Sequence, residues 1–288
     1  MSGNSIVNLW DRSKPAAILV EKISDAIGVL YEPTRITRKA QAEAKAEQIK
    51  SLINVETQAL TQKALQRFIT EETQKQENIE SIIGQALPLI SQEAKPENIE
   101  KDWLTNFFDK SKLTSDEEIK VLWANILSWE ANQPWTFSKR TINFMQSLDK
   151  NDALLFTKLC SFNVTFSDIQ PLVLDLNSDI YLSNWINFSS LNHLESIWLI
   201  NFWSLTGYIK KWFWRKWYIF IWDKMLSLEF KKENQNDLKV WKILFTNIWK
   251  ELASICNPER KEWFLEYIIE EYKKDSNIID IKIVNTWN

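Results

Sequence analysis

Residues 35–90 read RITRKAQAEAKAEQIKSLINVETQALTQKALQRFITEETQKQENIESIIGQALPLI, a run rich in Gln and Ala with no proline before Pro88. Nearly every residue in this run favours helix, and helix propensity summed over so long a window is informative. We therefore expect a helical rod over residues 33–92, as one helix or two in line, well beyond the usual length of ~11–12 residues.

Large apolar residues form an uneven stripe along this rod. They recur at spacings of three, four and seven, as Ile49, Leu52, Ile53, Leu60, Ala64 and Phe68. Such a stripe must be buried against something, although it is too irregular for sustained coiled-coil heptads. Three alternatives stay open: self-association through the rod, packing against the C-terminal domains of the same chain, and a helical spacer.

Composition limits the class of protein. The chain has 288 residues, a net charge of −3 and two cysteines, Cys160 and Cys256, which are far apart and form no C-x-x-C motif. This pattern favours a reducing compartment and no zinc site. Met1–Asn8 lacks the basic and apolar regions of a signal peptide, and no apolar run reaches the ~18 residues of a membrane span. We expect a cytoplasmic protein without a cofactor or a stable membrane contact.

Glycine and tryptophan are abnormally distributed. The chain has 4 glycines and 16 tryptophans, whereas average usage predicts roughly 20 glycines. Many of the tryptophans occur where helices or turns should end, the places that favour glycine. We therefore hypothesise that a codon such as UGA, read as glycine in the host, is written as tryptophan at twelve positions: Trp129, Trp135, Trp185, Trp198, Trp203, Trp212, Trp214, Trp217, Trp222, Trp241, Trp249 and Trp263. The alternative is a protein that is truly rich in tryptophan.

The N-terminal segment, residues 1–32, predicts a short amphipathic helix. Ser13 and Pro15 are typical of a helix start, and Gly28 followed by Pro33 predicts its end. The polar face mixes acids with lysines, which favours packing of this helix on the rod over binding at a membrane surface.

A second helical domain is predicted over residues 96–163. Ser115 and Glu118 have the spacing of a capping box, and Asp149 stands before a last helix that reaches Leu159. Aromatic residues at helical spacing, such as Trp103, Phe107 and Trp123, predict its core.

Residues 164–274 predict a small α+β module. Tyr218–Phe230 alternates like two strands around Trp222-Asp223, a two-residue hairpin loop, and Thr246 can cap a following helix. The order helix, hairpin, strand, helix looks like a winged-helix module. With residues 275–288 as a strand or frayed tail, the expected fold class is mainly α: long N-terminal helix, helical middle domain, and small winged-helix-like C-terminal module.

Several segments carry a family resemblance, most specifically YEP, QENIE, DW and FSKRT. Over most of its length the chain resembles a bacterial family called domain of unknown function 2806. That family has glycine at the positions of Trp129 and Trp135, and the resemblance implies no activity or catalytic residue. The chain also has a looser likeness to abortive-infection proteins, which implies a role in phage defence.

A basic cluster beside aromatic residues is the main candidate for ligand contact: Lys210, Lys211, Arg215 and Lys216. As written, KKWFWRKWY resembles a surface that stacks single-stranded nucleic acid or lies at a membrane interface. With glycine at the tryptophans it becomes a basic loop, and the G-x-G-x-x-G it then spells is followed by a strand where a dinucleotide site needs a helix. A solvated hairpin loop explains the same residues.

Other residues offer little chemistry. His193 is the single histidine and fits a helix surface, so a catalytic triad would have to use it. The two cysteines fit a core. The sequence therefore predicts a non-enzymatic interaction or regulatory protein that oligomerises through the rod. A nucleic-acid-binding regulator that uses the basic cluster is the alternative.

Overall fold

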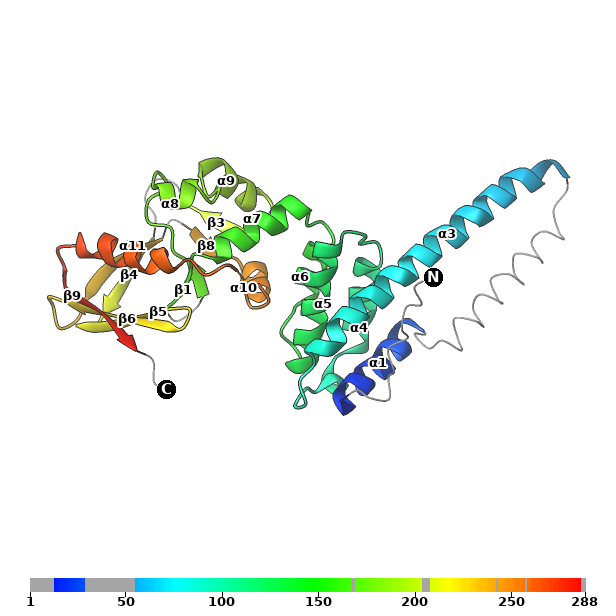
Figure 1. Ribbon diagram of the computed structural model, residues 1–288, viewed down its shortest axis with the longest axis horizontal. Coiled ribbons are helices and arrows are strands. Elements are labelled where there is room, and N and C mark those ends of the chain that lie inside the picture. Colours follow the sequence, from blue (N-terminus) through cyan, green and yellow to red (C-terminus); the bar gives the residue numbers. More distant parts are fainter. Residues whose placement is uncertain are drawn as a thin grey trace. The chain divides into compact units, whose positions relative to one another are not determined.

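A computed structural model describes residues 13–28, 55–166, 169–203, 208–241, 243–256 and 258–285. The chain divides into two compact units, Met1–Ser147 and Leu148–Asn288 (Figure 1). Each unit is described by itself below.

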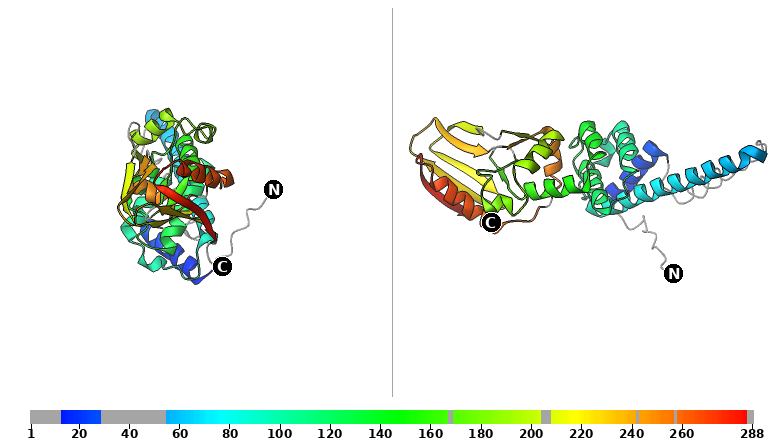
Figure 2. Two further views of the ribbon diagram at one scale, coloured as in Figure 1. Left: turned by 90° about the vertical axis from the view of Figure 1, so that its left-hand side faces the viewer. Right: turned by 90° about the horizontal axis from the view of Figure 1, so that it is seen from above.

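Unit 1 is helical. It contains α1 (Lys14–Ile27), α3 (Val55–Ala86), α4 (Lys101–Ser111), α5 (Glu117–Asn132) and α6 (Lys139–Met145), with short 3₁₀ turns at Leu87–Leu89 and Pro96–Asn98. The inner half of α3 packs on α5 and α4, and α1 packs on α4. The outer half of α3 continues beyond α4 and α5, as Figures 1 and 2 show from three directions.

Aromatic side chains fill the core between α4 and α5. Trp103 stacks on Phe107 with 5.2 Å between ring centroids, and Phe107 meets Trp123 edge-on at 5.1 Å. The indole N–H of Trp103 donates to the carbonyl of Phe137 at 2.8 Å, and that of Trp123 to Thr114 Oγ1 at 3.1 Å. Both tryptophans therefore bury their rings without losing a hydrogen bond.

One buried amide fixes α3 to the end of α4. Asn78, 1% exposed, donates from Nδ2 to the carbonyl of Lys112 at 2.9 Å. Gln74 donates to Asn78 Oδ1 from the preceding turn at 3.3 Å. Because a buried amide is costly without partners, this pair selects one docking register for the inner half of α3.

Unit 2 begins with α7 (Lys150–Cys160) and is built on a five-stranded antiparallel sheet. The strand order is β2-β1-β5-β6-β9, and the strands are β1 (Asn163–Thr165), β2 (Ile169–Pro171), β5 (Lys216–Ile221), β6 (Lys224–Phe230) and β9 (Ile278–Asn285). β9 pairs with β6 from Asn285↔Lys224 to Ile278↔Phe230, so residues 275–288 contain a strand of this sheet.

Two small sheets and four further helices make up the rest of the regular structure in the described residues of unit 2. β3 (Ile200–Phe202) pairs with β8 (Ile243–Phe245), and β4 (Tyr208–Phe213) pairs with β7 (Asn236–Trp241). The remaining helices are α8 (Asp179–Leu182), α9 (Phe188–Ser196), α10 (Asn247–Ala253) and α11 (Glu262–Lys273). Phe162 lies 5.0 Å from Tyr181 of α8 and 5.1 Å from Phe264 of α11, between ring centroids, which joins these helices to the sheet core.

The predicted fold class was wrong. The chain is a mixed α+β protein, because unit 2 carries nine strands in one five-stranded sheet and two ribbons among its described residues. Four of these strands, β1, β2, β3 and β8, have only three residues, too few to show an alternating pattern. Several strands also pair with partners distant in sequence, as in Thr165↔Phe220 and Leu226↔Ile283, and local patterns do not reveal such pairs. The long helices therefore dominated the prediction.

Several local predictions were confirmed. α1 begins at Lys14 and ends at Gly28, which has φ 69°. Asp149 forms a capping box with Asp152 at the start of α7, and Thr246 Oγ1 accepts from the backbone of residue 249 at the start of α10. The cap of α5 was assigned one residue early: Asp116, not Ser115, accepts from the backbone N–H of Glu118 and Ile119. Of the predicted rod, residues 33–54 lie outside the described residues, residues 55–86 form the single helix α3, and residues 87–92 form a 3₁₀ turn and non-helical chain.

Candidate interaction surfaces

The outer half of α3 exposes large apolar side chains. Leu60 is 72% exposed, Phe68 54% and Ile69 38%. Leu60 and Phe68 are two helical turns apart and lie near one face. Leu60 and Phe68 belong to the stripe that the sequence predicted, Ile69 does not, and the described part of unit 1 covers all three incompletely.

Charge is segregated along the same helix. The basic residues Lys63 and Arg67 occupy the outer part, and the acidic residues Glu71, Glu72, Glu77 and Glu80 follow with one lysine among them. Arg67 Nε lies 3.6 Å from Glu71, and Lys75 Nζ lies 2.6 Å from Glu72. Because Glu56 also lies in the outer part, that end of α3 is only weakly basic, whereas residues 71–80 are acidic, and Phe68 and Ile69 lie close to the boundary.

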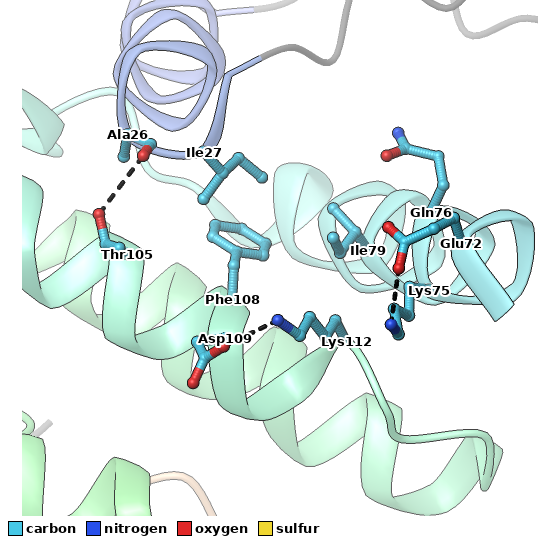
Figure 3. A pocket seen from close by; sticks show the side chains of 10 residues that line it. All are labelled: Ala26, Ile27, Glu72, Lys75, Gln76, Ile79, Thr105, Phe108, Asp109 and Lys112. Carbon is cyan, nitrogen blue, oxygen red and sulfur yellow. Dashed lines mark hydrogen bonds and ion pairs between the residues drawn. The ribbon is translucent and has the colours of Figure 1, made fainter. Parts of the chain in front are cut away.

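An open groove of about 380 Å³ lies between α1, α3 and α4 (Figure 3). Its floor is apolar, with Ile79 and Phe108, and its rim carries the pairs Lys75–Glu72 and Lys112–Asp109 at 2.6 and 2.7 Å. Hydrogen bonds from Lys112 and Lys110 hold the pKa of Asp109 below its ordinary value. Because these rim charges are balanced in pairs, the lining selects no particular ligand charge.

The basic cluster of the sequence lies around the turn between β4 and β5. Arg215 is engaged by acids: its Nε lies 3.1 Å from Glu229 Oε1 and its Nη1 lies 2.6 Å from Glu233 Oε1. The hydrogen bond to Glu233, and after it the one to Glu229, holds the pKa of Arg215 above its ordinary value. The guanidinium therefore joins β6 and the β6–β7 loop to this turn.

The three lysines of the cluster differ in their surroundings. Lys210 Nζ lies over aromatic rings, 5.4 Å from the centroid of Phe166 and 5.9 Å from that of Phe213. Lys216 is exposed but stands directly across the strand pair from Glu229. Lys211 is exposed on β4. The structure brings the four residues to one region, and nearby glutamates offset part of their charge.

The single histidine is paired with a carboxylate that the sequence did not single out. His193 Nε2 on α9 lies 2.5 Å from Asp152 Oδ1 on α7. Asp152 also accepts from the Asp149 N–H through Oδ2 at 3.3 Å. Ser196 Oγ donates to the His193 carbonyl at 2.7 Å, so this hydroxyl engages the backbone and not the imidazole. The histidine thus joins two helices through the cap of one of them.

The two cysteines, distant in sequence, are in contact. Cys160 ends α7 and is buried, and its thiol interacts with that of Cys256. Burial raises the pKa of Cys160 well above its ordinary value, whereas hydrogen bonds from Cys160 and Thr157 lower the pKa of Cys256. Sequence reasoning missed this contact and the His193–Asp152 pair, because no local pattern connects residues so far apart.

Neither a metal-binding cluster nor a membrane-spanning helix occurs in the described ranges. They contain no group of three or more His, Cys, Asp or Glu side chains arranged to hold a metal ion. In the same ranges, no helix combines the length and the apolar character needed to span a membrane.

Comparison with known proteins gives a family for the chain. No curated protein and no solved structure matches it. The model of one family, described as a protein of unknown function (DUF2806), matches residues 62–269. That match begins in α3 and ends in α11, covering well over half of the chain, and it agrees with the resemblance carried by QENIE, DW and FSKRT. The chain therefore belongs to the DUF2806 family.

Proposed function

We propose that this protein is a non-enzymatic interaction protein that self-associates through the outer half of α3 and leaves unit 2 to recognise a partner. The observation that supports this proposal is the exposure of Leu60, Phe68 and Ile69 on a helix that continues beyond its own domain. Burying one such side chain contributes roughly 1.5–3 kcal/mol. Packing of a second apolar helix face against these residues would therefore be favourable.

The occupant that fits best is a second copy of the same helix in antiparallel orientation. A two-fold axis near Phe68 and Ile69 sets Lys63 and Arg67 of one α3 against the acidic residues 71–80 of the other. Complementary charges of this kind fix the orientation of helical pairs, and a two-fold interface uses one patch twice.

The alternative, a nucleic-acid-binding regulator, has less support. Contact with phosphate needs cations that are free to neutralise it, and Arg215 is already shared between Glu229 and Glu233. A place in phage defence is part of the proposal only through the resemblance to abortive-infection proteins.

The test is the mass of the full-length protein in solution, by light scattering over a range of concentrations, for the wild type and two variants. We expect a dimer, and Phe68→Glu should raise its dissociation constant at least ~100-fold, because symmetry removes the side chain twice. Leu113→Glu is the matched control, since Leu113 is 59% exposed and lies outside α3. A monomeric wild type, or equal effects of the two variants, contradicts self-association through α3.

Salt-sensitive binding of DNA or RNA, lost when Lys210, Lys211, Arg215 and Lys216 are all replaced by alanine, would instead favour the alternative.

A further inference from the structure

Five tryptophans have a backbone conformation that favours glycine. Among the described residues, six non-glycine residues have positive φ: Gln235 (57°) and the tryptophans Trp135 (75°), Trp185 (64°), Trp198 (64°), Trp212 (70°) and Trp222 (55°). A side chain with a Cβ is strained in this region, whereas glycine adopts it freely. Positive φ is rarest for bulky residues, so its concentration on tryptophan requires a cause.

Two of the five end helices in the hydrogen-bond pattern where glycine is most common. After α8, Ile186 N–H donates to the Tyr181 carbonyl at 2.9 Å and Trp185 N–H to the Leu182 carbonyl at 3.0 Å. After α9 the same pair recurs, from Leu199 to Leu194 at 3.0 Å and from Trp198 to Glu195 at 2.9 Å. This is the Schellman motif, with its left-handed residue at Trp185 and Trp198.

A glycine of this chain provides the internal comparison. Gly28 ends α1 with φ 69° and donates its N–H to the Ser24 carbonyl at 2.8 Å. The φ values of Trp185 and Trp198 are within a few degrees of it. The chain thus places glycine and tryptophan in one backbone role, which only glycine fills without strain.

The other three tryptophans lie at turn or bulge positions that favour glycine. Trp222 is the first residue of the two-residue loop between Ile221 and Lys224, where a type II′ turn takes glycine. Trp212 lies in a bulge of β4, between the pairs Lys210↔Leu238 and Phe213↔Asn236, and bulges of the G1 type carry a left-handed glycine.

Trp135 follows Pro134 in the turn after α5. Proline followed by a residue of positive φ is typical of a type II turn, which requires glycine or asparagine there.

The side chains of these tryptophans contribute little packing. Trp135, Trp185, Trp198 and Trp212 are 68–76% exposed. The indole N–H of Trp222 is shielded from solvent yet has no hydrogen-bond partner among the described residues. Trp103 and Trp123 are 5% and 0% exposed and donate their indole hydrogens, so tryptophan in this chain behaves normally where φ is helical.

We propose that Trp135, Trp185, Trp198, Trp212 and Trp222 are glycines in the protein that the native host makes, through a codon read there as glycine. UGA is such a codon, because a code that assigns it to tryptophan writes tryptophan at the same position. The proposal covers these five residues on backbone geometry. The other seven tryptophans that the sequence suggested as glycines lack positive φ, and peptide masses would identify those residues as well.

The consequence reaches the basic cluster. Glycine at residue 212 removes one exposed ring from the KKWFWRKWY segment, and with it part of the stacking surface on which single-strand binding would rest.

The decisive experiment is peptide mass spectrometry of the protein purified from its native host. We expect each of the five positions to have the residue mass of glycine, while Trp103 and Trp123 have that of tryptophan. Tryptophan at any of the five overturns the proposal for that position.

A recombinant series tests the physical basis separately. The printed sequence is the reference, with Trp198→Gly, Trp198→Ala and Trp103→Gly as variants. We expect glycine at residue 198 to raise the melting temperature above both the reference and the alanine variant, and Trp103→Gly to lower it. A melting temperature for Trp198→Ala equal to that of Trp198→Gly overturns the strain argument, because alanine cannot relieve a left-handed backbone.

Discussion

The α4–α5 pair of unit 1 and the β4–β6 strands of unit 2 both carry tryptophan, in opposite surroundings. In the first, Trp103 and Trp123 are buried on helices and donate hydrogen bonds to Phe137 and Thr114. In the second, Trp212 and Trp222 lie at a bulge and a hairpin loop with positive φ.

The comparison shows that residue type alone does not determine whether a tryptophan stabilises the fold. Tryptophan stabilises a fold when its ring is buried and its N–H is paired. At a turn, the backbone conformation decides which residue fits, and the side chain has little influence.

The largest effect is expected in the core of unit 1. Replacing Trp123 by alanine should lower the free energy of unfolding by about 3–5 kcal/mol, because it leaves a cavity beside Phe107. Urea unfolding followed by circular dichroism measures the loss. A loss below about 1 kcal/mol would show that Trp123 is not a core residue and would remove the contrast between the regions.

The next effect concerns what holds the turn around residue 135. Glu130, 3% exposed, accepts backbone hydrogen bonds from Trp135, Thr136 and Phe137 at 2.7, 3.1 and 2.9 Å. Since hydrogen bonds to a charged group contribute roughly 1.5–3 kcal/mol, Glu130→Gln should destabilise the protein by about 2 kcal/mol. Trp135→Gly, the control, should not destabilise it. If the control costs as much, the indole and not the carboxylate holds this turn.

Alkaline pH should lower the stability of unit 2 more than that of unit 1. Burial raises the pKa of Tyr181 and of Tyr272 in unit 2, whereas the core of unit 1 described above is built on Trp and Phe. A raised folded pKa means that the unfolded tyrosine, with a pKa of about 10, loses its proton first. The stability is therefore complete below pH ~10 and falls above it.

Above pH ~10, each buried tyrosine should lower the free energy of unfolding by about 1.4 kcal/mol per pH unit. Hydrogen exchange at pH 8 and pH 11, resolved by peptide, checks this expectation. Equal loss of protection in both units would contradict it.

The smallest effect belongs to the turns. Trp185→Gly should stabilise the protein by about 1 kcal/mol, because a left-handed conformation costs an L-residue roughly 1–2 kcal/mol. The same exchange at Trp263, which lies within α11 and has no positive φ, should destabilise it by about 1 kcal/mol. Thermal unfolding of the two variants provides the test, and shifts of the same sign would show that φ does not decide the outcome.

Local structure was predictable wherever it depends on residues that are close together in the sequence. The loop at Trp222-Asp223, the cap at Thr246 and the capping box at Asp149 all depend on residues within a few positions of one another. The stripe on α3 was also predictable, since helical spacing alone shows which residues share a face. The cap of α5 was one residue off, because Ser115 and Asp116 are both good caps and the choice between them needs the backbone conformation.

The candidate sites were predicted less well than the elements. The sequence assigned Arg215 to a basic cluster, but its pairing with Glu229 and Glu233 depends on how β6 and the following loop fold back over the turn. The pair His193–Asp152 and the contact Cys160–Cys256 likewise arise only when distant segments meet.

By itself, the sequence determined where most of the helices and the β5–β6 hairpin form, because propensity, caps and turns act over a few residues. It named twelve tryptophans as glycine positions, and the backbone conformation then supported five of them. Tertiary structure alone decided the five-stranded sheet and the pairing of Arg215 with Glu229 and Glu233. The pairing of β6 with β9, far along the chain, costs loop-closure entropy and is offset only when the whole core of unit 2 is buried. Such cooperative burial has no signature in any short stretch of residues.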